Sequence, residues 1–113
     1  MYDLREHKKL ISQLVSEANQ NDENWRWSVK SVGKTKARIF WSYLEYCGQP
    51  EPYFVIELED TGDGYWIHAL DERDSYIESE IVVANDLPFL NCPLDKAIEK
   101  MVRCIVNTAH ACY

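Results

Sequence analysis

Residues 51–86 read EPYFVIELEDTGDGYWIHALDERDSYIESEIVVAND, and this stretch decides the fold of the chain. Apolar and polar residues alternate over residues 53–59, and a period of two is typical of a half-buried strand. Such a strand turns Phe54, Ile56 and Leu58 toward a core and leaves Glu57 on the solvent side. The centre of the chain is therefore expected to be a β-sheet.

Two polar interruptions divide the rest of this stretch. Asp60–Gly64 has two glycines and two aspartates between apolar runs, and Asp71–Asp74 is a second turn. Residues 65–70 and 75–84 are therefore predicted as further strands, although residues 75–84 could instead begin as a helical turn. Because connections this short join antiparallel neighbours, the strands are expected to form a meander.

A second hairpin is expected ahead of this stretch. Residues 25–30 and 36–46 both alternate, and Gly33 lies in the turn between them. The second of these strands places Trp41 on the same face as two smaller apolar residues. The prolines at positions 50 and 52 interrupt pairing, because proline has no backbone N–H to donate.

Both ends of the chain have a helical period. Residues 3–20 hold an apolar stripe, and Asp3 is a suitable N-cap. Pro93 opens a second helix with its own stripe, at the position where a missing N–H costs nothing. The predicted fold class is α+β, an antiparallel meander of four to five strands with the N- and C-terminal helices packed on one face. Residues 1–113 are expected to form a single domain.

Charge is distributed unevenly along the chain. The formal net charge is −7, but residues 51–86 alone hold 11 acids and one base, whereas the flanking parts are weakly basic. A negative surface repels nucleic acid and anionic lipid and favours a basic partner. The first hairpin has five bases and no acid, so Lys36 and Arg38 are expected to form cross-strand pairs with acids of the next strand. Such pairs leave the acids beyond residue 59 as the stronger candidates for binding.

Acids and aromatic residues together form the predicted binding surface. Side chains at i and i+2 of a strand share a face about 6.8 Å apart, so Glu57 and Glu59 point the same way. The same reasoning applies to Glu78 and Glu80. We expect these carboxylates to form one row on the solvent face, continued by the acids of the two turns. Carboxylates that steer and aromatic side chains that anchor are typical of a surface that binds a basic protein. The expected partner-binding residues are Glu57, Glu59, Asp60, Asp63, Tyr65, Trp66, Asp71, Glu72, Asp74, Tyr76, Glu78 and Glu80.

Patterns for catalysis and metal binding are weak. The glycines form no phosphate-binding loop, and the GxSxG and HExxH motifs are missing from the sequence. Cys104, His110 and Cys112 are metal-ligand types, but their spacing is not that of a zinc site, and Cys104 is better explained as a structural thiol in a helix. Paired carboxylates are used in metal-dependent hydrolysis, yet acids are so abundant here that one pair means little. We expect no enzyme activity, no catalytic residue, no bound metal and no cofactor.

Three classes of function are compatible with these observations. The preferred one is a small acidic inhibitor that occludes a basic partner, such as a nuclease or another nucleic-acid-binding protein. Immunity, anti-restriction and anti-CRISPR proteins of phages and mobile elements resemble this chain in size, charge and fold class, although they share no motif with it. The alternatives are an acidic homodimeric adaptor similar to secretion chaperones, with aromatic faces that bind clients, and a small metal-dependent hydrolase. Direct binding of nucleic acid by the basic hairpin, with Trp25 or Trp41 stacked on bases, is opposed by the net charge.

The sequence also suggests where the protein is found. Its first residues, MYDLREHKKL, lack the apolar segment of a secretory signal, and no apolar run approaches the roughly 18 residues of a membrane helix. Four unevenly spaced cysteines do not predict a disulfide framework. We therefore expect a cytoplasmic protein with reduced thiols and no membrane contact, either a monomer or a homodimer.

Overall fold

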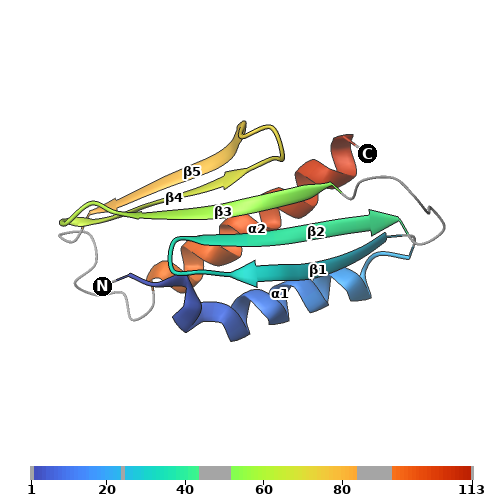
Figure 1. Ribbon diagram of the computed structural model, residues 1–113. Coiled ribbons are helices and arrows are strands. Elements are labelled where there is room, and N and C mark those ends of the chain that lie inside the picture. Colours follow the sequence, from blue (N-terminus) through green and yellow to red (C-terminus); the bar gives the residue numbers. More distant parts are fainter. Residues whose placement is uncertain (1, 24, 44–51, 84–92, 113) are drawn as a thin grey trace.

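The computed structural model describes residues 2–23, 25–43, 52–83 and 93–112. A short 3₁₀ turn, η1 (Leu4–His7), leads into helix α1 (Lys8–Gln20), and helix α2 (Pro93–Cys112) follows the strands (Figure 1). Asp3 caps the 3₁₀ turn, as predicted, and its carboxylate accepts the backbone N–H of Arg5. The strands are β1 (Trp25–Val32), β2 (Lys36–Tyr43), β3 (Tyr53–Asp60), β4 (Gly64–Leu70) and β5 (Tyr76–Val83).

The five strands form one sheet in the order β1-β2-β3-β4-β5, and every neighbouring pair is antiparallel. The predicted α+β meander is confirmed, and the segment that the sequence left open between strand and helix is the strand β5. Positions 44–46, predicted as the end of the second strand, lie outside the described residues. Within the described chain, neither α1 nor α2 combines the length and apolar character needed to cross a membrane.

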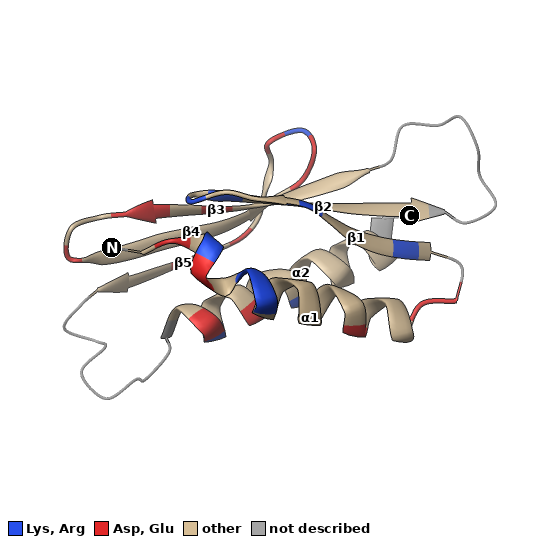
Figure 2. Ribbon diagram, turned by 60° about the horizontal axis from the view of Figure 1, so that its bottom comes forward, with Lys and Arg blue, Asp and Glu red and all other residues tan. Residues whose placement is uncertain are grey.

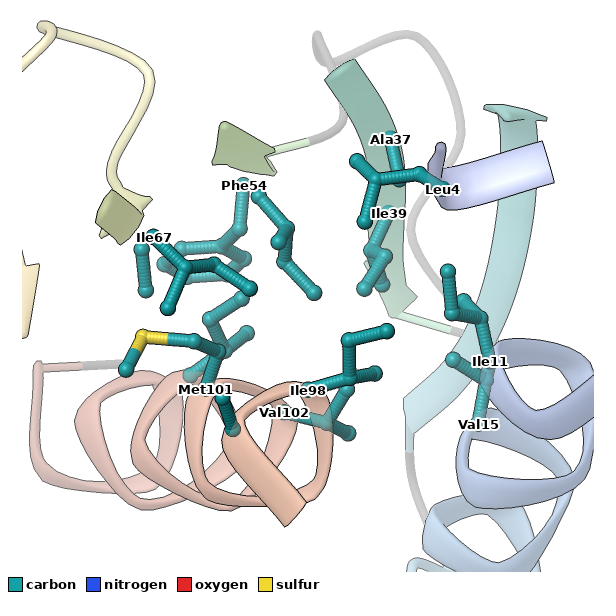
Figure 3. Packing of buried hydrophobic residues seen from close by; sticks show 14 of the residues in the cluster. Leu4, Ile11, Val15, Ala37, Ile39, Phe54, Ile67, Ile98, Met101 and Val102 are labelled. Carbon is teal, nitrogen blue, oxygen red and sulfur yellow. The ribbon is translucent and has the colours of Figure 1, made fainter. Parts of the chain in front are cut away.

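Both helices cover the same face of the sheet, and Figures 1 and 2 show this layer from two directions. Helix α1 packs against β1, and α2 packs against β3, β4 and β5. Each fully buried aliphatic or aromatic side chain in this layer contributes about 1.5–3 kcal/mol relative to an exposed one. Figure 3 shows the centre of the core, where the predicted stripes of both helices meet the inward side chains of the strands. The core includes Leu4, Ile11, Val15, Trp27, Ile39, Trp41, Phe54, Ile56, Leu58, Ile67, Ile98, Met101 and Ile105.

The buried carboxylate of Asp22 anchors the polar segment that follows α1. Asp22 is only 8% exposed. Its Oδ2 accepts hydrogen bonds from the indole Nε1 of Trp27 at 3.3 Å and of Trp41 at 3.4 Å, and its Oδ1 accepts the backbone N–H of Trp25. Nε2 of His110, in the last turn of α2, lies 3.3 Å from the same Oδ2. The carboxylate therefore joins the first hairpin to both helices.

Strands β4 and β5 approach each other closely at the start of β4. A Cβ atom built on Gly64 would lie 1.8 Å from the carbonyl oxygen of Val82, so only glycine fits this position without a shift of the backbone. This close approach lies at the end of the predicted turn Asp60–Gly64, which the structure confirms as the connection between β3 and β4.

Candidate functional site: the helix-free face of the sheet

The candidate site is the face of the sheet that no described helix covers, called the helix-free face below. The cross-strand register sets the order of its side chains. Glu59 of β3 lies beside Trp66 of β4, and Glu57 lies beside His68. On the other side of Trp66 follows Ile81 of β5. Acidic, aromatic and aliphatic side chains therefore alternate across three strands.

One extra residue in β5 changes which side chains reach this face. The register shifts at Ile77, which forms a bulge, and Tyr76 therefore lies on the helix-free face. Glu78 and Glu80 lie on the opposite side, because Glu80 is the register partner of the buried core residue Ile67. The prediction that these two acids share a row with the β3 carboxylates is wrong, because pairing register, rather than spacing along one strand, decides the face.

Glu78 and Glu80 instead contact α2. Oε2 of Glu80 lies 3.0 Å from Nζ of Lys100, and this hydrogen bond raises the pKa of the ammonium group. Sγ of Cys104 lies 3.8 Å from Oε2 of Glu78. Burial, together with the Glu78 carboxylate, raises the pKa of the thiol, which disfavours a reactive thiolate. These two acids hold α2 against the edge strand.

Tyr65 requires a second correction. Its ring has no exposed surface and packs against Tyr2, with ring centroids 4.9 Å apart. It lies on the helix side of β4, two residues before Ile67. Burial, with a smaller effect of the Glu80 carboxylate, raises the pKa of its hydroxyl to about 12. Tyr65 is therefore a core residue and is not available to a partner.

The acids of the two turns lie at opposite ends of β4. This strand has seven residues, which span about 23 Å, so the turns cannot form one continuous row. Figure 2 shows the two groups of acids as separate red segments. Oδ1 of Asp60 accepts a backbone N–H of its own turn at 2.8 Å, and Oδ1 of Asp71 accepts two at 2.9 Å each. The predicted residues Asp71, Glu72 and Asp74 therefore lie apart from Asp60 and Asp63.

The acids that do stay together lie at one corner of the sheet, beside the β3–β4 turn, where Glu59 belongs to the helix-free face and Asp60, the register partner of Tyr65, to the other face. We call Glu59, Asp60 and Asp63 the acidic corner, and all three are exposed. The neighbouring carboxylate of Glu57 lies 3.6 Å from Nζ of Lys36, which is one of the predicted cross-strand pairs. A shallow groove beside the corner is lined by Thr35, Lys36, Glu57, Leu58, Glu59, Asp60 and Thr61.

Exposed apolar side chains lie on β5, and two of them, Ile81 and Val83, lie at the same end of the sheet as the acidic corner. In the described part of the chain, the large hydrophobic residues with high exposure are all on β5, namely Tyr76 (59%), Ile81 (65%) and Val83 (41%). Apolar anchors beside a charged rim are typical of protein interfaces. Ile81 and Val83 were not predicted as binding residues. The alternation of β5 places them on the other face of the strand from Glu78 and Glu80, and those two glutamates had been assigned to the binding face.

His68 is the buried centre of the helix-free face. Its ring has no exposed surface and lies between Trp66 and Tyr76, with centroids 4.2 and 4.6 Å away. Nδ1 lies 3.0 Å from Oγ of Ser79, and Nε2, which has no hydrogen-bond partner among the described atoms, lies 3.8 Å from Oε2 of Glu59. A hydroxyl, an imidazole and a carboxylate in this order are the components of a catalytic triad. Here the imidazole is buried and the carboxylate lies beyond hydrogen-bond distance, so the group does not form one. His68 instead packs between the rings of Trp66 and Tyr76.

The half of the helix-free face on β1 and β2 is basic. Arg38 lies opposite Val55, so the second expected cross-strand pair with an acid of β3 is not formed by the register partners. Nζ of Lys30, at a bulge of β1, lies 5.9 Å from the ring centroid of Phe40. We call the exposed bases of this half the basic strip, namely Arg26, Lys30, Lys36 and Arg38.

Other kinds of site have less support. Among the described residues, no group of three or more His, Cys, Asp or Glu side chains is arranged to hold a metal ion. Trp41 is 1% exposed and stacks on Trp25 with centroids 3.8 Å apart, so it lies in the core rather than on a surface for bases. Comparison with protein-family models, with curated proteins and with solved structures gives no significant match. Any functional proposal therefore rests on the geometry of the helix-free face.

Proposed function

We propose that this protein is a small binding inhibitor, in the manner of immunity, anti-restriction or anti-CRISPR proteins. It blocks a basic, nucleic-acid-handling protein by occlusion and catalyses no reaction. The acidic corner occupies the partner's basic groove, where phosphates would otherwise lie, and Trp66 and Ile81 become buried beside it. One observation carries this proposal, namely that exposed carboxylates and exposed apolar side chains adjoin on one open sheet face.

Electrostatics favours a basic partner over a neutral one. The chain has a net charge of −7, and the acidic corner adds local negative potential at an exposed end of the sheet. Complementary charge raises the association rate, and salt screens it over about 10 Å at about 0.1 M. The apolar side chains next to the corner would give the complex its residence time, because buried aromatic anchors dominate the binding energy of most interfaces.

The proposal is tested by capture of a partner and by assay of that partner. The immobilised protein should retain a basic protein from a lysate of its host, and the affinity should fall at least about tenfold when salt rises from about 50 to about 500 mM. The purified partner should lose nucleic-acid binding or cleavage when the inhibitor is added. Glu59→Lys combined with Asp63→Lys should abolish both effects. Glu6→Lys combined with Glu17→Lys, on the exposed side of η1 and α1, makes the same charge change away from the site and should preserve both effects.

An adaptor similar to secretion chaperones is the second candidate, and the exposure of Tyr76, Ile81 and Val83 favours it. Such an adaptor would hold an apolar client segment against β5, and high salt would strengthen rather than weaken that contact. Replacement of Ile81 and Val83 by serine separates the two functions. The adaptor would lose its client entirely, whereas the inhibitor would keep its salt-sensitive affinity for a basic partner and lose only part of its binding energy.

A further inference from the structure

Glu59 of the acidic corner lies on the same helix-free face as the basic strip, but farther toward the β3–β4 turn. The corner adjoins the β3–β4 turn, whereas the strip follows β2 and β1 from Arg38 toward Arg26, away from that turn. Lys36 and Glu57 form an ion pair where the two regions meet. Asp63 and Arg38, farther out on each side, have no ion pair within the described residues. One face therefore presents unneutralised charge of both signs.

We infer that two copies of this chain associate face to face, with the acidic corner of each copy against the basic strip of the other. A two-fold axis that lies in the plane between the copies exchanges two patches of one face, so a single operation forms both contacts. This axis would pass near the Lys36–Glu57 pair, which lies between the two patches. Each copy thus supplies the complement of the other.

The positions of three aromatic side chains on the helix-free face are compatible with the same two-fold axis. Trp66 is the register partner of Glu59 in the acidic corner. Phe40 of β2 and Tyr53 of β3 are register partners, and their ring centroids are 5.9 Å apart. This pair lies two residues along the strands from the pair Arg38 and Val55, on the side away from the β3–β4 turn. All three rings are partly exposed, so they have surface left to bury. In a dimer with this two-fold axis, Trp66 of one copy lies over Phe40 and Tyr53 of the other. An aromatic contact therefore accompanies each charged contact.

The size of the face sets the strength of this association. Five strands about 4.8 Å apart and about eight residues long offer a face of roughly 600 Å². Stable interfaces usually bury about 800 Å² on each partner. The dimer is therefore expected to dissociate at micromolar concentrations and to be sensitive to salt, because exposed charges supply much of its attraction.

This inference goes beyond the proposed inhibitor function and does not depend on it. If both hold, they are linked, because the second copy covers the same carboxylates that a basic partner would need. A basic partner would then compete with self-association, and the dimer would act as a store of inhibitor with a protected binding face.

Sedimentation equilibrium tests the inference in wild-type protein from about 1 µM to about 1 mM. At low salt the mass should rise from that of a monomer to that of a dimer, and it should return to a monomer at about 0.5 M salt. Two reversed variants should each be monomeric at low salt, the corner variant Glu59→Arg with Asp63→Arg and the strip variant Lys30→Glu with Arg38→Glu. Their equimolar mixture should form a heterodimer, because the reversed corner then faces the reversed strip and the native strip faces the native corner.

A matched control separates this geometry from nonspecific attraction of opposite charge. Lys96→Glu with Arg103→Glu makes the same charge change as the strip variant, but on the exposed side of α2. This control should dimerise with itself as wild type does and should form no heterodimer with the corner variant. A wild-type protein that is monomeric at every concentration in low salt overturns the inference. The inference is also overturned if either reversed variant still dimerises. It is overturned as well if the mixture stays monomeric while both variants keep a native circular dichroism spectrum. Partner capture that persists without any dimer would leave the inhibitor proposal intact.

Discussion

Oδ2 of Asp22 accepts a hydrogen bond from Nε1 of Trp27 over 3.3 Å, in a region with almost no contact with solvent. The same oxygen lies 3.4 Å from Nε1 of Trp41 and 3.3 Å from Nε2 of His110. The polar segment that follows α1 therefore contains the residue that ties the first hairpin to α2. A buried carboxylate with several donors is a feature on which stability depends strongly.

Replacement of Asp22 by alanine should destabilise the protein by about 2 kcal/mol or more. The substitution leaves buried indole N–H groups without this acceptor, and each unsatisfied buried donor costs about 1–3 kcal/mol. Urea unfolding followed by tryptophan fluorescence measures the change. The exposed neighbour Glu23 is the control, and Glu23→Ala should stay within about 0.5 kcal/mol of wild type. Equal values for the two variants would contradict the role assigned to Asp22.

Gly64→Ala should cost about 1–3 kcal/mol, because the added Cβ forces the backbones of β4 and β5 apart. The nearest atom, the carbonyl oxygen of Val82, is only 1.8 Å from the position that the Cβ would occupy. At Gly33 the nearest atom is the carbonyl oxygen of Lys36 at 3.4 Å, so Gly33→Ala is the matched control with a smaller effect. The melting temperature should fall further in Gly64→Ala than in Gly33→Ala. A larger fall in Gly33→Ala would contradict the close approach of β4 and β5 at Gly64.

Tyr65→Phe should leave stability at neutral pH unchanged or raise it. The hydroxyl of Tyr65 is buried without a hydrogen-bond partner among the described atoms, so its removal deletes an unsatisfied polar group. The folded-state pKa of about 12 lies above the ordinary value of 10.0, so the unfolded state ionises first. Wild-type stability should therefore fall as pH rises from about 10 to about 12.

The phenylalanine variant should lack that part of the alkaline loss, and denaturant midpoints near neutral pH and at high pH reveal the difference. Tyr53→Phe is the control, because the hydroxyl of Tyr53 lies near the surface and donates to the backbone oxygen of Glu72 at 3.5 Å. That variant should lose stability with pH as wild type does. If Tyr65→Phe and Tyr53→Phe have the same pH profile, Tyr65 is not the group that titrates.

Two neighbouring aspartates of the acidic corner should separate stability from binding. Asp60 accepts the backbone N–H of Gly62 at 2.8 Å, so Asp60→Ala should lose about 0.5–1.5 kcal/mol. Asp63 makes no such bond within the described residues, and Asp63→Ala should unfold at the same urea concentration as wild type. Both variants should weaken capture of a basic partner to a similar degree. Loss of capture in Asp60→Ala alone would indicate that turn geometry, rather than negative charge, is recognised.

The elements of the fold were predictable because their signals are local. The stripe with Ile11 and Val15, the turn Asp60–Gly64 and the proline at the start of α2 each act within a few residues of chain. Antiparallel order followed from short connections alone. The meander and the side of the sheet on which the helices lie therefore needed no knowledge of long-range contacts.

The candidate site was less predictable, because it depends on how strands pair. Spacing along β5 puts Glu78 and Glu80 on one face but cannot say which face that is, and the pairing with β4 places them toward α2. Tyr65 was misplaced for the same reason, since an aromatic residue after a turn has no local mark of burial. His68 was similarly hidden, because its burial comes from Trp66 and Tyr76 on two different strands.

The bulge at Ile77 makes the content of the binding surface depend on strand register as well as on residue identity. If Ile77 paired with Leu70 instead of bulging, β5 would alternate strictly and Tyr76 would lie on the side of the sheet that faces α2. The stacking partner of His68 would then be removed without any substitution. In evolutionary terms, gain or loss of a bulge at a single position of the edge strand is the shortest route by which this fold could exchange one binding specificity for another.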